Sequence, residues 1–448
     1  MGRRSHSRAL SVWTNGQRVG TWSLPTRGDM AFFYDTEWMN SPGGRPLSLS
    51  LPFIGDQALS GERVHNYFNN LLPDSEAIRR RLAVRFKTQS DGAFDLLQAI
   101  GRDCVGAVQL LGIDETPTDI ASIVGTPMNE ADVEKLLIQT TSAGPLSSLD
   151  EGAEIEELRI SLAGAQEKTA LLWHEGAWMR PHGSTPTTHI LKLPLGLVGN
   201  RKADFSTSVE NEWLCMNLLA EYGLPVARTA MLQFGSQKVL GVERFDRRLH
   251  SSGTWLMRLP QEDFCQVKGV PSHLKYESDG GPGLADLASV LSGSVQAEQD
   301  LATLLKTQVL FWMLAAPDGH AKNFSIRLLP QGRYALTPLY DVMSIWPAEG
   351  SGASQFSIHK AKLAMALLGK NKHYHFKDVQ RRHFNSTAAK CFQLPDAEAL
   401  IEQVLERTPL AIDKVAKKLP SGFPERVAAS IFKGLRRSAE QLDRMPKL

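Results

Sequence analysis

A short polar segment, residues 318–323, follows a strongly apolar stretch and holds Asp318 and Asn323 five positions apart. Protein kinases use this spacing: the carboxylate accepts the proton of the acceptor hydroxyl, and the amide binds magnesium. Two strand-like runs follow, and the second leads into Asp341. A hairpin of these runs folds Asp341 back beside Asn323, where both can bind one metal ion. The pattern therefore predicts phosphoryl transfer with Asp318 as the catalytic base.

The five-residue spacing taken alone is weak evidence, because a polar helix end followed by an ordinary turn gives the same letters. Features around it support the catalytic interpretation. His320 stands beside Asp318, within reach of a triphosphate. Upstream, Lys192 ends an apolar strand-like run, where a lysine needs a carboxylate partner or a bound anion. On the next helix Glu210 and Glu212 are candidate partners; Glu212 is preferred, although either would suit a solvated helix face.

The loop 163–168 lies between two strand-like runs, where its backbone N–H groups could cover phosphates. It lacks the second glycine of both common phosphate-binding patterns, so a plain hairpin loop would also explain it. Ser161, just ahead of the loop, is by default a strand serine with local hydrogen bonds. The order of loop, lysine strand and polar segment along the chain favours the phosphate-binding interpretation.

Hydrophobic periodicity and turn residues predict the elements that must position these groups. Asn15-Gly16 is a hairpin signal, and Asp74 and Ser75 are placed to cap a helix. The segment 140–157, rich in small, polar and acidic residues, indicates a boundary. The expected strands are 10–13, 18–24, 30–34, 47–51, 158–162, 169–173, 189–193, 239–245, 324–329 and 334–339. The expected helices are 75–86, 207–222 and 297–316.

The composition is that of an ordinary soluble globular chain, with 448 residues, 42% hydrophobic and 22% charged. Four widely spaced cysteines predict neither a zinc site nor a disulfide framework, and they favour a reduced, cytosolic setting. The longest apolar run, 309–316, is too short to cross a bilayer. We therefore expect a cytoplasmic protein without a signal peptide or a membrane partner.

The net charge of +2 is unevenly distributed. From residue 360 onward the chain carries 18 Lys and Arg against 9 Asp and Glu, which suggests an anionic partner for this part. Its densest cluster contains Lys377, Arg381 and Arg382. These residues either form a solvated helix face or contact DNA phosphates, and both interpretations stay open.

Six longer motifs together resemble the HipA family of serine/threonine kinase toxins, and the match runs over nearly the whole chain. They are 68–74 and 101–106 (accessory part), 160–170 (phosphate loop), 188–194 (lysine strand), 242–247 (hinge) and 318–323 (catalytic loop). The resemblance implies an α+β, bilobal protein-kinase-like fold with an N-terminal β-rich accessory subdomain and a mainly helical C-terminal lobe. The expected parts are the accessory subdomain (1–112), an acidic connecting segment (113–157), an N-lobe (158–246) and a C-lobe with the basic C-terminal part (247–448).

The resemblance also implies roles for individual residues. Asp318 is the expected catalytic base, and Asn323 and Asp341 are the expected magnesium ligands. Ser161 matches the serine at which the family phosphorylates and silences itself, because a phosphate there repels ATP. The residues expected to contact ATP are Ala163, Gly164, Ala165, Gln166, Glu167, Lys168, Lys192, Glu243, Arg244, Phe245, His320, Ala321, Lys322, Asn323, Tyr340 and Asp341.

The resemblance further implies ATP and Mg2+ as cofactors and glutamate–tRNA ligase or a related translation component as the substrate. It implies a HipB-like helix-turn-helix antitoxin, and a complex with it that represses its own operon and is nucleoid-associated on operator DNA. Two alternatives stay open. One is a kinase of a lipid or small-molecule acceptor, because 318–323 is also similar to a lipid-kinase catalytic loop. The other is a non-catalytic corepressor, against which the complete set of Asp318, Asn323, Asp341 and Lys192 argues.

Overall fold

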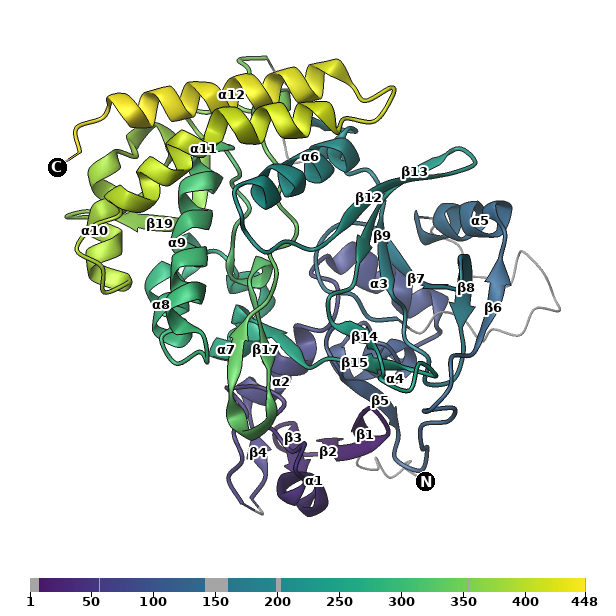
Figure 1. Ribbon diagram of the computed structural model, residues 1–448. Coiled ribbons are helices and arrows are strands. Elements are labelled where there is room, and N and C mark those ends of the chain that lie inside the picture. Colours follow the sequence, from purple (N-terminus) through teal and green to yellow (C-terminus); the bar gives the residue numbers. More distant parts are fainter. Residues whose placement is uncertain (1–7, 56, 142–159, 199–202, 353, 448) are drawn as a thin grey trace.

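The computed structural model describes residues 8–55, 57–141, 160–198, 203–352 and 354–447. Figure 1 shows three parts: an accessory domain, a β-sheet lobe and a helical lobe. The mixed α+β architecture agrees with the expected bilobal kinase-like fold. In the part of the chain that is described, no helix is long and apolar enough to span a membrane.

The accessory domain is built on a five-stranded antiparallel sheet in the order β4-β3-β2-β1-β5. The predicted hairpin is confirmed, since Asn15 and Gly16 have φ values of 46° and 80°, as a two-residue turn between twisted strands requires. Helices pack on the sheet around Trp22, which stacks on Phe68 with 4.0 Å between ring centroids. The elements are β1 (Arg8–Thr14), β2 (Gln17–Leu24), β3 (Ala31–Tyr34), α1 (Thr36–Asn40), β4 (Leu59–Ser60), α2 (Glu62–Asn69), α3 (Glu76–Arg85), α4 (Ala93–Ile100) and β5 (Gln109–Gly112).

The N-lobe is a six-stranded sheet in the order β12-β13-β9-β7-β8-β6, with α5 and α6 packed on it. The segment 113–157 was expected to be a connector, but its described part supplies β6 and α5 to this sheet. Sequence reasoning missed β6 because its partner β8 lies about fifty residues further on and none of its four side chains is buried. The elements are β6 (Gly125–Met128), α5 (Glu130–Thr141), β7 (Lys168–His174), β8 (Ala177–Pro181), β9 (His189–Lys192), α6 (Ser208–Glu221), β12 (Thr229–Phe234) and β13 (Gln237–Glu243).

The C-lobe is mainly helical and is centred on the buried helix α9. Helices α11 and α12 lie across α6 and α9, as the yellow ribbons in Figure 1 show. Two short sheets add to the helices: β16-β17-β18 and the hairpin β19-β20. The elements are β16 (Gln261–Asp263), α7 (Phe264–Lys268), α8 (Leu284–Leu291), α9 (Ala297–Met313), β17 (Ser325–Leu328), β18 (Tyr334–Leu336), β19 (Lys362–Leu368), β20 (Lys372–His375), α10 (Arg381–Cys391), α11 (Glu398–Lys417) and α12 (Glu425–Arg444).

Two expected strands are absent among the described residues, because other groups take their backbone hydrogen bonds. In 47–51 only a bridge between Ser48 and Leu51 forms, and the N–H of Leu49 donates to Glu262 of the C-lobe. In 158–162 only Ile160 makes a bridge; residues 158 and 159, and most of the boundary 140–157, lie outside the described residues.

The predicted helix after Pro73 is confirmed as α3, and its N-cap is Ser75, whose hydroxyl accepts from the N–H of Ile78. Asp74 does not cap this helix. Its carboxylate instead pairs with Lys275 of the C-lobe, with 3.0 Å between the two atoms. Asp74, two positions before α3, therefore joins two parts of the molecule.

Candidate active site

A cavity of about 470 Å³ lies where the three parts of the chain meet. Its size is within the range of pockets that enclose a small organic ligand. The N-lobe sheet, the catalytic loop and the end of α2 with the following turn all contribute side chains to its wall. One part of the wall is apolar and suits a flat ring; it is formed by Leu162, Ile190, Val198, Phe205, Val242, Phe245, Met343 and Ile345.

The catalytic loop begins where α9 ends, and Ala315 reverses the chain there with a left-handed φ of 48°. The loop is closed internally: the amide nitrogen of Asn323 donates to the backbone carbonyl of Asp318 over 2.7 Å. This leaves Oδ1 of Asn323 without a partner among the described residues. His320 is buried, and its Nε2 lies 3.7 Å from Oδ1 of Asp318. Burial lowers the pKa of His320 although the Asp318 carboxylate opposes this, so the ring is neutral at pH 7.

The predicted hairpin after the catalytic loop is confirmed, since β17 pairs antiparallel with β18. It is held to the loop by Tyr340, whose hydroxyl lies 2.6 Å from that of Ser325 and donates to the carbonyl of Lys322 over 2.9 Å. Asp341 follows with a φ of 60°, a conformation unfavourable for most residues. This strained backbone aims its carboxylate into the cavity, as the hypothesis of a metal ligand requires.

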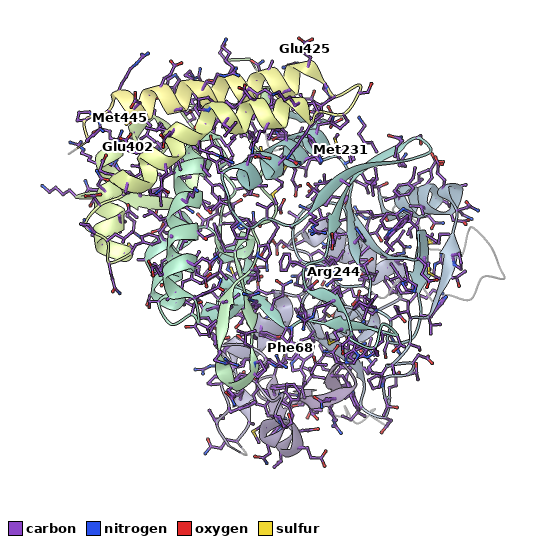
Figure 2. All side chains as sticks on the ribbon, in the orientation of Figure 1. Phe68, Met231, Arg244, Glu402, Glu425 and Met445 are labelled. Atoms are coloured by element: carbon purple, nitrogen blue, oxygen red, sulfur yellow. The ribbon has the colours of Figure 1, made fainter. Side chains whose placement is uncertain are left out.

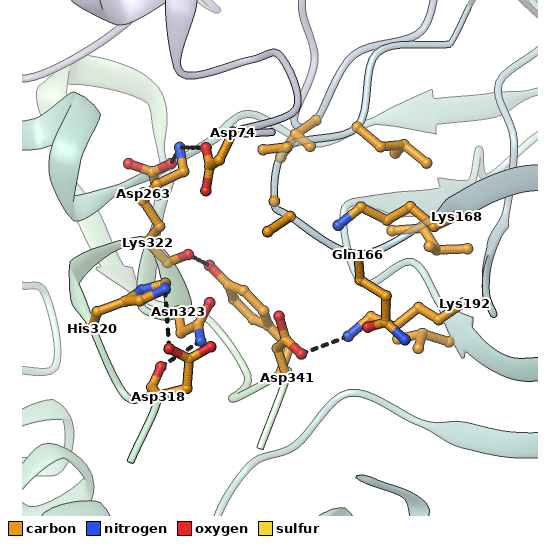
Figure 3. A pocket seen from close by; sticks show the side chains of 18 of the residues that line it. Asp74, Gln166, Lys168, Lys192, Asp263, Asp318, His320, Lys322, Asn323 and Asp341 are labelled. Atoms are coloured by element: carbon orange, nitrogen blue, oxygen red, sulfur yellow. Dashed lines mark hydrogen bonds and ion pairs between the residues drawn. The ribbon is translucent and has the colours of Figure 1, made fainter. Parts of the chain in front are cut away.

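Lys192 connects the two lobes across the cavity. Its ammonium donates to Glu212 over 2.7 Å. It also donates to Asp341 over 2.8 Å, the contact drawn in Figure 3. The preference for Glu212 is thus confirmed, because Glu210 pairs instead with Lys238 on the neighbouring strand. Burial would lower the pKa of Lys192, but the two carboxylates raise it, so the side chain is a cation at any physiological pH.

The remaining charges of the cavity suit a polyanion. Burial and the nearby Lys192 lower the pKa of Lys168 to about 8, so the side chain is still mostly a cation at pH 7, and an anion bound beside it would stabilise that charge. Burial opposes ionisation of Asp341, yet Lys192 and Lys168 lower its pKa to about 2. Figure 3 shows these two lysines facing Asp318, Asn323 and Asp341 across the pocket. The cavity thus holds two cations, the buried Lys192 and the partly buried Lys168, and a metal-bound triphosphate would balance their charge.

The phosphate loop is docked on the accessory domain. The carbonyl of Gly164, a residue with φ 106°, accepts from the N–H of Asp74 over 3.0 Å. Ser161 is buried, and its hydroxyl donates to the carbonyl of Leu71 over 2.7 Å. Its N–H donates to the carbonyl of Asp103 over 3.1 Å. Three backbone sites of the accessory domain thus hold the loop in place.

Most residues expected at the nucleotide line the cavity, and two do not. Glu167 turns away to pair with Arg81 of the accessory domain. Ala321 is fully buried, and its N–H donates to the carbonyl of Lys275. Both residues lie within the family motifs, but side-chain direction is set by contacts that a motif does not contain.

Lys322 and Arg244 line the cavity, but their cationic groups are engaged elsewhere. The ammonium of Lys322 donates to Asn70 and Asp263, each over 2.8 Å, so it joins the catalytic loop to the accessory domain. Figure 3 shows this ammonium beside Asp263 and Asp74. The guanidinium of Arg244, marked near the middle of the molecule in Figure 2, pairs with Asp103 and Asp246. Both cations hold the site together and are not free to bind phosphate.

Several charged or polar groups of the site were missed by sequence reasoning. Asp103 of the accessory domain lies among three buried arginines that follow the N-lobe sheet, Arg244, Arg247 and Arg258. Tyr276 donates a hydrogen bond to Oδ1 of Asp318. The aspartate of the accessory motif 101–106 was the available signal, because a carboxylate followed by Cys104 and Val105 needs a cationic partner if the segment is buried.

Among the described residues no group of three His, Cys, Asp or Glu side chains could hold a metal by itself. The donors present are the carboxylate of Asp341 and the amide oxygen of Asn323. Such a pair fits magnesium, which keeps several water or phosphate oxygens and needs few protein ligands. The residues present therefore fit the cofactors ATP and Mg2+.

The basic region near residue 380 differs from the expected helix face. Lys377 and Arg382 are exposed, but Arg381 is fully buried at the start of α10. Its guanidinium pairs with Glu398 over 2.6 Å and with Glu402. The expectation that Arg381 contacts DNA is wrong for this structure, because the side chain is enclosed and neutralised by two carboxylates.

Comparison with known proteins agrees with this architecture. The model of the HipA N-terminal domain matches residues 10–111, and that of the HipA-like C-terminal domain matches residues 160–412. The protein Y4mE of Sinorhizobium fredii is 36% identical over 341 residues, which cover 75% of this chain and 77% of Y4mE. The serine/threonine-protein kinase toxin HipA of Shewanella oneidensis is 27% identical over 366 residues, 78% of this chain and 76% of that protein.

The fold is shared with a solved structure. HipA in the complex of HipA, HipB and operator DNA from Shewanella oneidensis MR-1 superposes with a TM-score of 0.77 at 23% identity, covering 96% of this chain and 97% of that one. The accessory domain, the two lobes and their relative arrangement are therefore common to both. The chain belongs to the HipA family of serine/threonine-protein kinase toxins.

Proposed function

We propose that this kinase transfers the γ-phosphoryl group of ATP to a protein hydroxyl at the cavity between its lobes. The observation that supports the proposal is the convergence of Asp318, Asn323, Asp341 and Lys192 on one pocket from separate elements. A domain kept only for binding would not require this complete set. The apolar wall beside the hinge suits the adenine ring, and the lysines opposite suit the phosphates.

In this proposal each residue has a separate task. Lys192, held by Glu212, orients the phosphates, and the backbone of the phosphate loop covers them. Asn323 and Asp341 hold magnesium, which when bound neutralises charge on the transferred group. Asp318 accepts the proton of the acceptor hydroxyl as that oxygen approaches phosphorus. The neutral, buried ring of His320 lies beside the carboxylate of Asp318 and covers the side of this carboxylate that faces the protein interior.

We further propose that the acceptor is a translation component such as glutamate–tRNA ligase. The support for this substrate is the family resemblance of the catalytic and phosphate loops. A lipid or small-molecule acceptor is the alternative, because the site residues define phosphoryl transfer better than they define the acceptor.

The same resemblance supports a HipB-like antitoxin as partner, and with it repression at operator DNA in the cytoplasm. The related Shewanella HipA was solved together with HipB and operator DNA. Lys377 and Arg382 remain the proposed DNA contacts on this chain, because both are exposed. Arg381 is excluded from this set by its burial.

Inhibitory autophosphorylation at Ser161 is part of the proposal. Because this hydroxyl is buried against Leu71, a phosphate there cannot be accommodated with the loop in its present position. The modified loop would have to leave the accessory domain and would lose the geometry that covers ATP.

The experiment that tests the proposed function is transfer of labelled phosphate from Mg-ATP to glutamate–tRNA ligase. Wild type is compared with Asp318→Ala and, as a control, with Asp279→Ala, an exposed aspartate of the same lobe. We expect labelling by wild type and by the control only. Equal labelling by Asp318→Ala would show that Asp318 is not the base. Label on the wild-type kinase itself is expected from autophosphorylation at Ser161, whereas an unlabelled ligase beside a labelled kinase would show that the ligase is not the acceptor.

A further inference from the structure

Tyr276 is a residue of the C-lobe that contacts the catalytic loop and has no role assigned so far. It lies between α7 and α8, in a segment of short turns, and it lines the cavity. Its hydroxyl donates a hydrogen bond to Oδ1 of Asp318. Its ring packs edge-on against His320, with 4.9 Å between centroids and 89° between planes. The catalytic carboxylate and its histidine neighbour are therefore both in contact with one tyrosine.

The backbone around Tyr276 is fixed by several contacts. The carbonyl of Lys275 accepts from the N–H of Ala321 in the catalytic loop over 3.2 Å, and the carbonyl of Tyr276 accepts from Gly281 over 3.0 Å. The ammonium of Lys275 pairs with Asp74 of the accessory domain. Since its chain is held on both sides, the phenol cannot follow the carboxylate if the carboxylate turns. The hydrogen bond therefore restrains Asp318.

Asp318 needs such a restraint because its side chain is 45% exposed. An exposed carboxylate rotates freely, whereas a general base must keep one oxygen within hydrogen-bond distance of the proton that it removes. Oδ1 is occupied by Tyr276, and His320 lies nearby. Oδ2 has no partner among the described residues. One oxygen is thus anchored, and the other is available.

We propose that Tyr276 is a positioning residue for phosphoryl transfer, which holds Oδ1 of Asp318 so that Oδ2 is presented to the acceptor hydroxyl. This inference rests on the proposed role of Asp318. The hydroxyl proton of the acceptor passes to Oδ2 while the acceptor oxygen bonds to the γ-phosphorus. The bond from that phosphorus to the bridging oxygen of ATP breaks, and ADP leaves with the electron pair.

Tyr276 retains its own proton throughout this step. Burial and the carboxylate of Asp318 both raise the pKa of Tyr276 above its ordinary value, so the phenol remains a donor at working pH. A phenylalanine at this position would keep the ring against His320 and lose only the hydrogen bond. The substitution therefore separates the positioning role from packing.

The test is the Tyr276→Phe variant of the full chain. Tyr334→Phe is the matched control, because its hydroxyl donates to the carbonyl of Val290, away from the cavity. Consumption of labelled Mg-ATP is counted as inorganic phosphate and as label on the chain, which requires no identified acceptor. We expect kcat of Tyr276→Phe to fall roughly 10- to 100-fold, with KM for ATP and the melting temperature near those of wild type and of the control.

A double-variant cycle with Asp318→Asn separates this inference from the proposed function. In the Asp318→Asn background, Tyr276→Phe should cause no further loss, since the phenol acts only through the carboxylate. An unchanged kcat for Tyr276→Phe, or a kcat loss matched by weaker ATP binding, would overturn the positioning role while leaving Asp318 as the base. Wild-type turnover by Asp318→Asn, or none by wild type, would instead overturn the proposed function and this inference with it.

Discussion

The hydroxyl of Ser161 and the backbone carbonyl of Leu71 form a buried hydrogen bond of 2.7 Å between the phosphate loop and the accessory domain. The neighbouring carbonyl of Gly164 accepts from Asp74 of the same domain. The accessory domain thus forms one wall of the cavity between the lobes. Any charge on Ser161 must displace the loop, because a charged group enclosed beside a carbonyl and shielded from solvent is strongly unfavourable.

Ser161→Glu should therefore weaken ATP binding at least tenfold. A buried carboxylate beside a carbonyl is strongly unfavourable, so the phosphate loop would separate from the accessory domain. Ser161→Ala removes only the hydrogen bond, should cost about 1 kcal/mol of stability and should keep activity. Calorimetric titration with ATP gives the affinities, and Ser252→Glu, at an exposed serine, is the control. Wild-type affinity in Ser161→Glu would contradict the docking argument.

Glu212 and Glu210 provide a matched pair on one helix. Glu212 holds Lys192 in the cavity, whereas Glu210 pairs with Lys238 outside it. We expect Glu212→Gln to lower kcat/KM for ATP roughly tenfold or more, because Lys192 then lacks one of its two anchors. Glu210→Gln should stay within about twofold of wild type. Steady-state kinetics on both variants decides this, and equal effects would argue against a specific Lys192–Glu212 role.

Asp103 should carry a large share of the stability of the junction between the accessory domain and the hinge. Its carboxylate faces Arg244, Arg247 and Arg258, so Asp103→Ala leaves buried cations uncompensated and should cost about 3–5 kcal/mol. Urea unfolding at pH 7 measures this cost. Asp114→Ala, at an exposed position, is the control and should change stability by less than about 0.5 kcal/mol.

The carboxylate of Asp103 should also make the stability of the protein depend on pH in the acidic range. Burial opposes ionisation, but the three arginines lower the pKa of Asp103 far below its ordinary 3.8. A carboxylate whose pKa is lower in the folded than in the unfolded state stabilises the fold at any pH above its unfolded-state pKa. This stabilisation is lost as the pH falls toward its folded-state pKa. Wild type should therefore lose stability below about pH 4 faster than Asp103→Ala does. Parallel pH profiles for the two proteins would contradict this sign.

Arg381 and Arg382 are adjacent but should behave differently. Arg381→Ala leaves Glu398 without its buried partner and should destabilise the C-lobe by about 2–3 kcal/mol. This cost is smaller than the cost of breaking a fully buried ion pair, because the second carboxylate, Glu402, is half exposed. Thermal unfolding measures this effect. The exposed Arg382→Ala should leave the melting temperature unchanged, and a similar loss in both variants would contradict the assignment.

Lys377→Ala with Arg382→Ala should change DNA binding of the antitoxin complex and leave folding intact. Each neutralised phosphate contributes about 0.9 to the slope of log K against log salt, so losing both should flatten it by about 1.8. Fluorescence anisotropy at several salt concentrations gives the slope. An unchanged slope would remove this surface from the proposed DNA contacts.

The sequence by itself determined the local parts of the site. The Asn15-Gly16 turn, the β17-β18 hairpin and the strand that carries Lys192 all follow from residue type and spacing over a few positions. Local backbone preference and hydrophobic alternation are sufficient to predict such elements, and in the turn and the hairpin the hydrogen bonds also join segments that are neighbours in the chain. For the same reason, the spacing of the two strand-like runs is enough to predict that Asp341 returns to the side of Asn323.

Only the tertiary structure decided which charges are free and which are used to join the domains. Lys322, Arg244 and Arg381 are basic residues within promising motifs, yet each is enclosed by carboxylates, most of them from distant segments. Tyr276 lies 42 positions from Asp318 and meets it through packing that no periodicity encodes. A buried charge is stable only beside its partner, and that partner is chosen by folding the whole chain, so sequence spacing alone could not identify it.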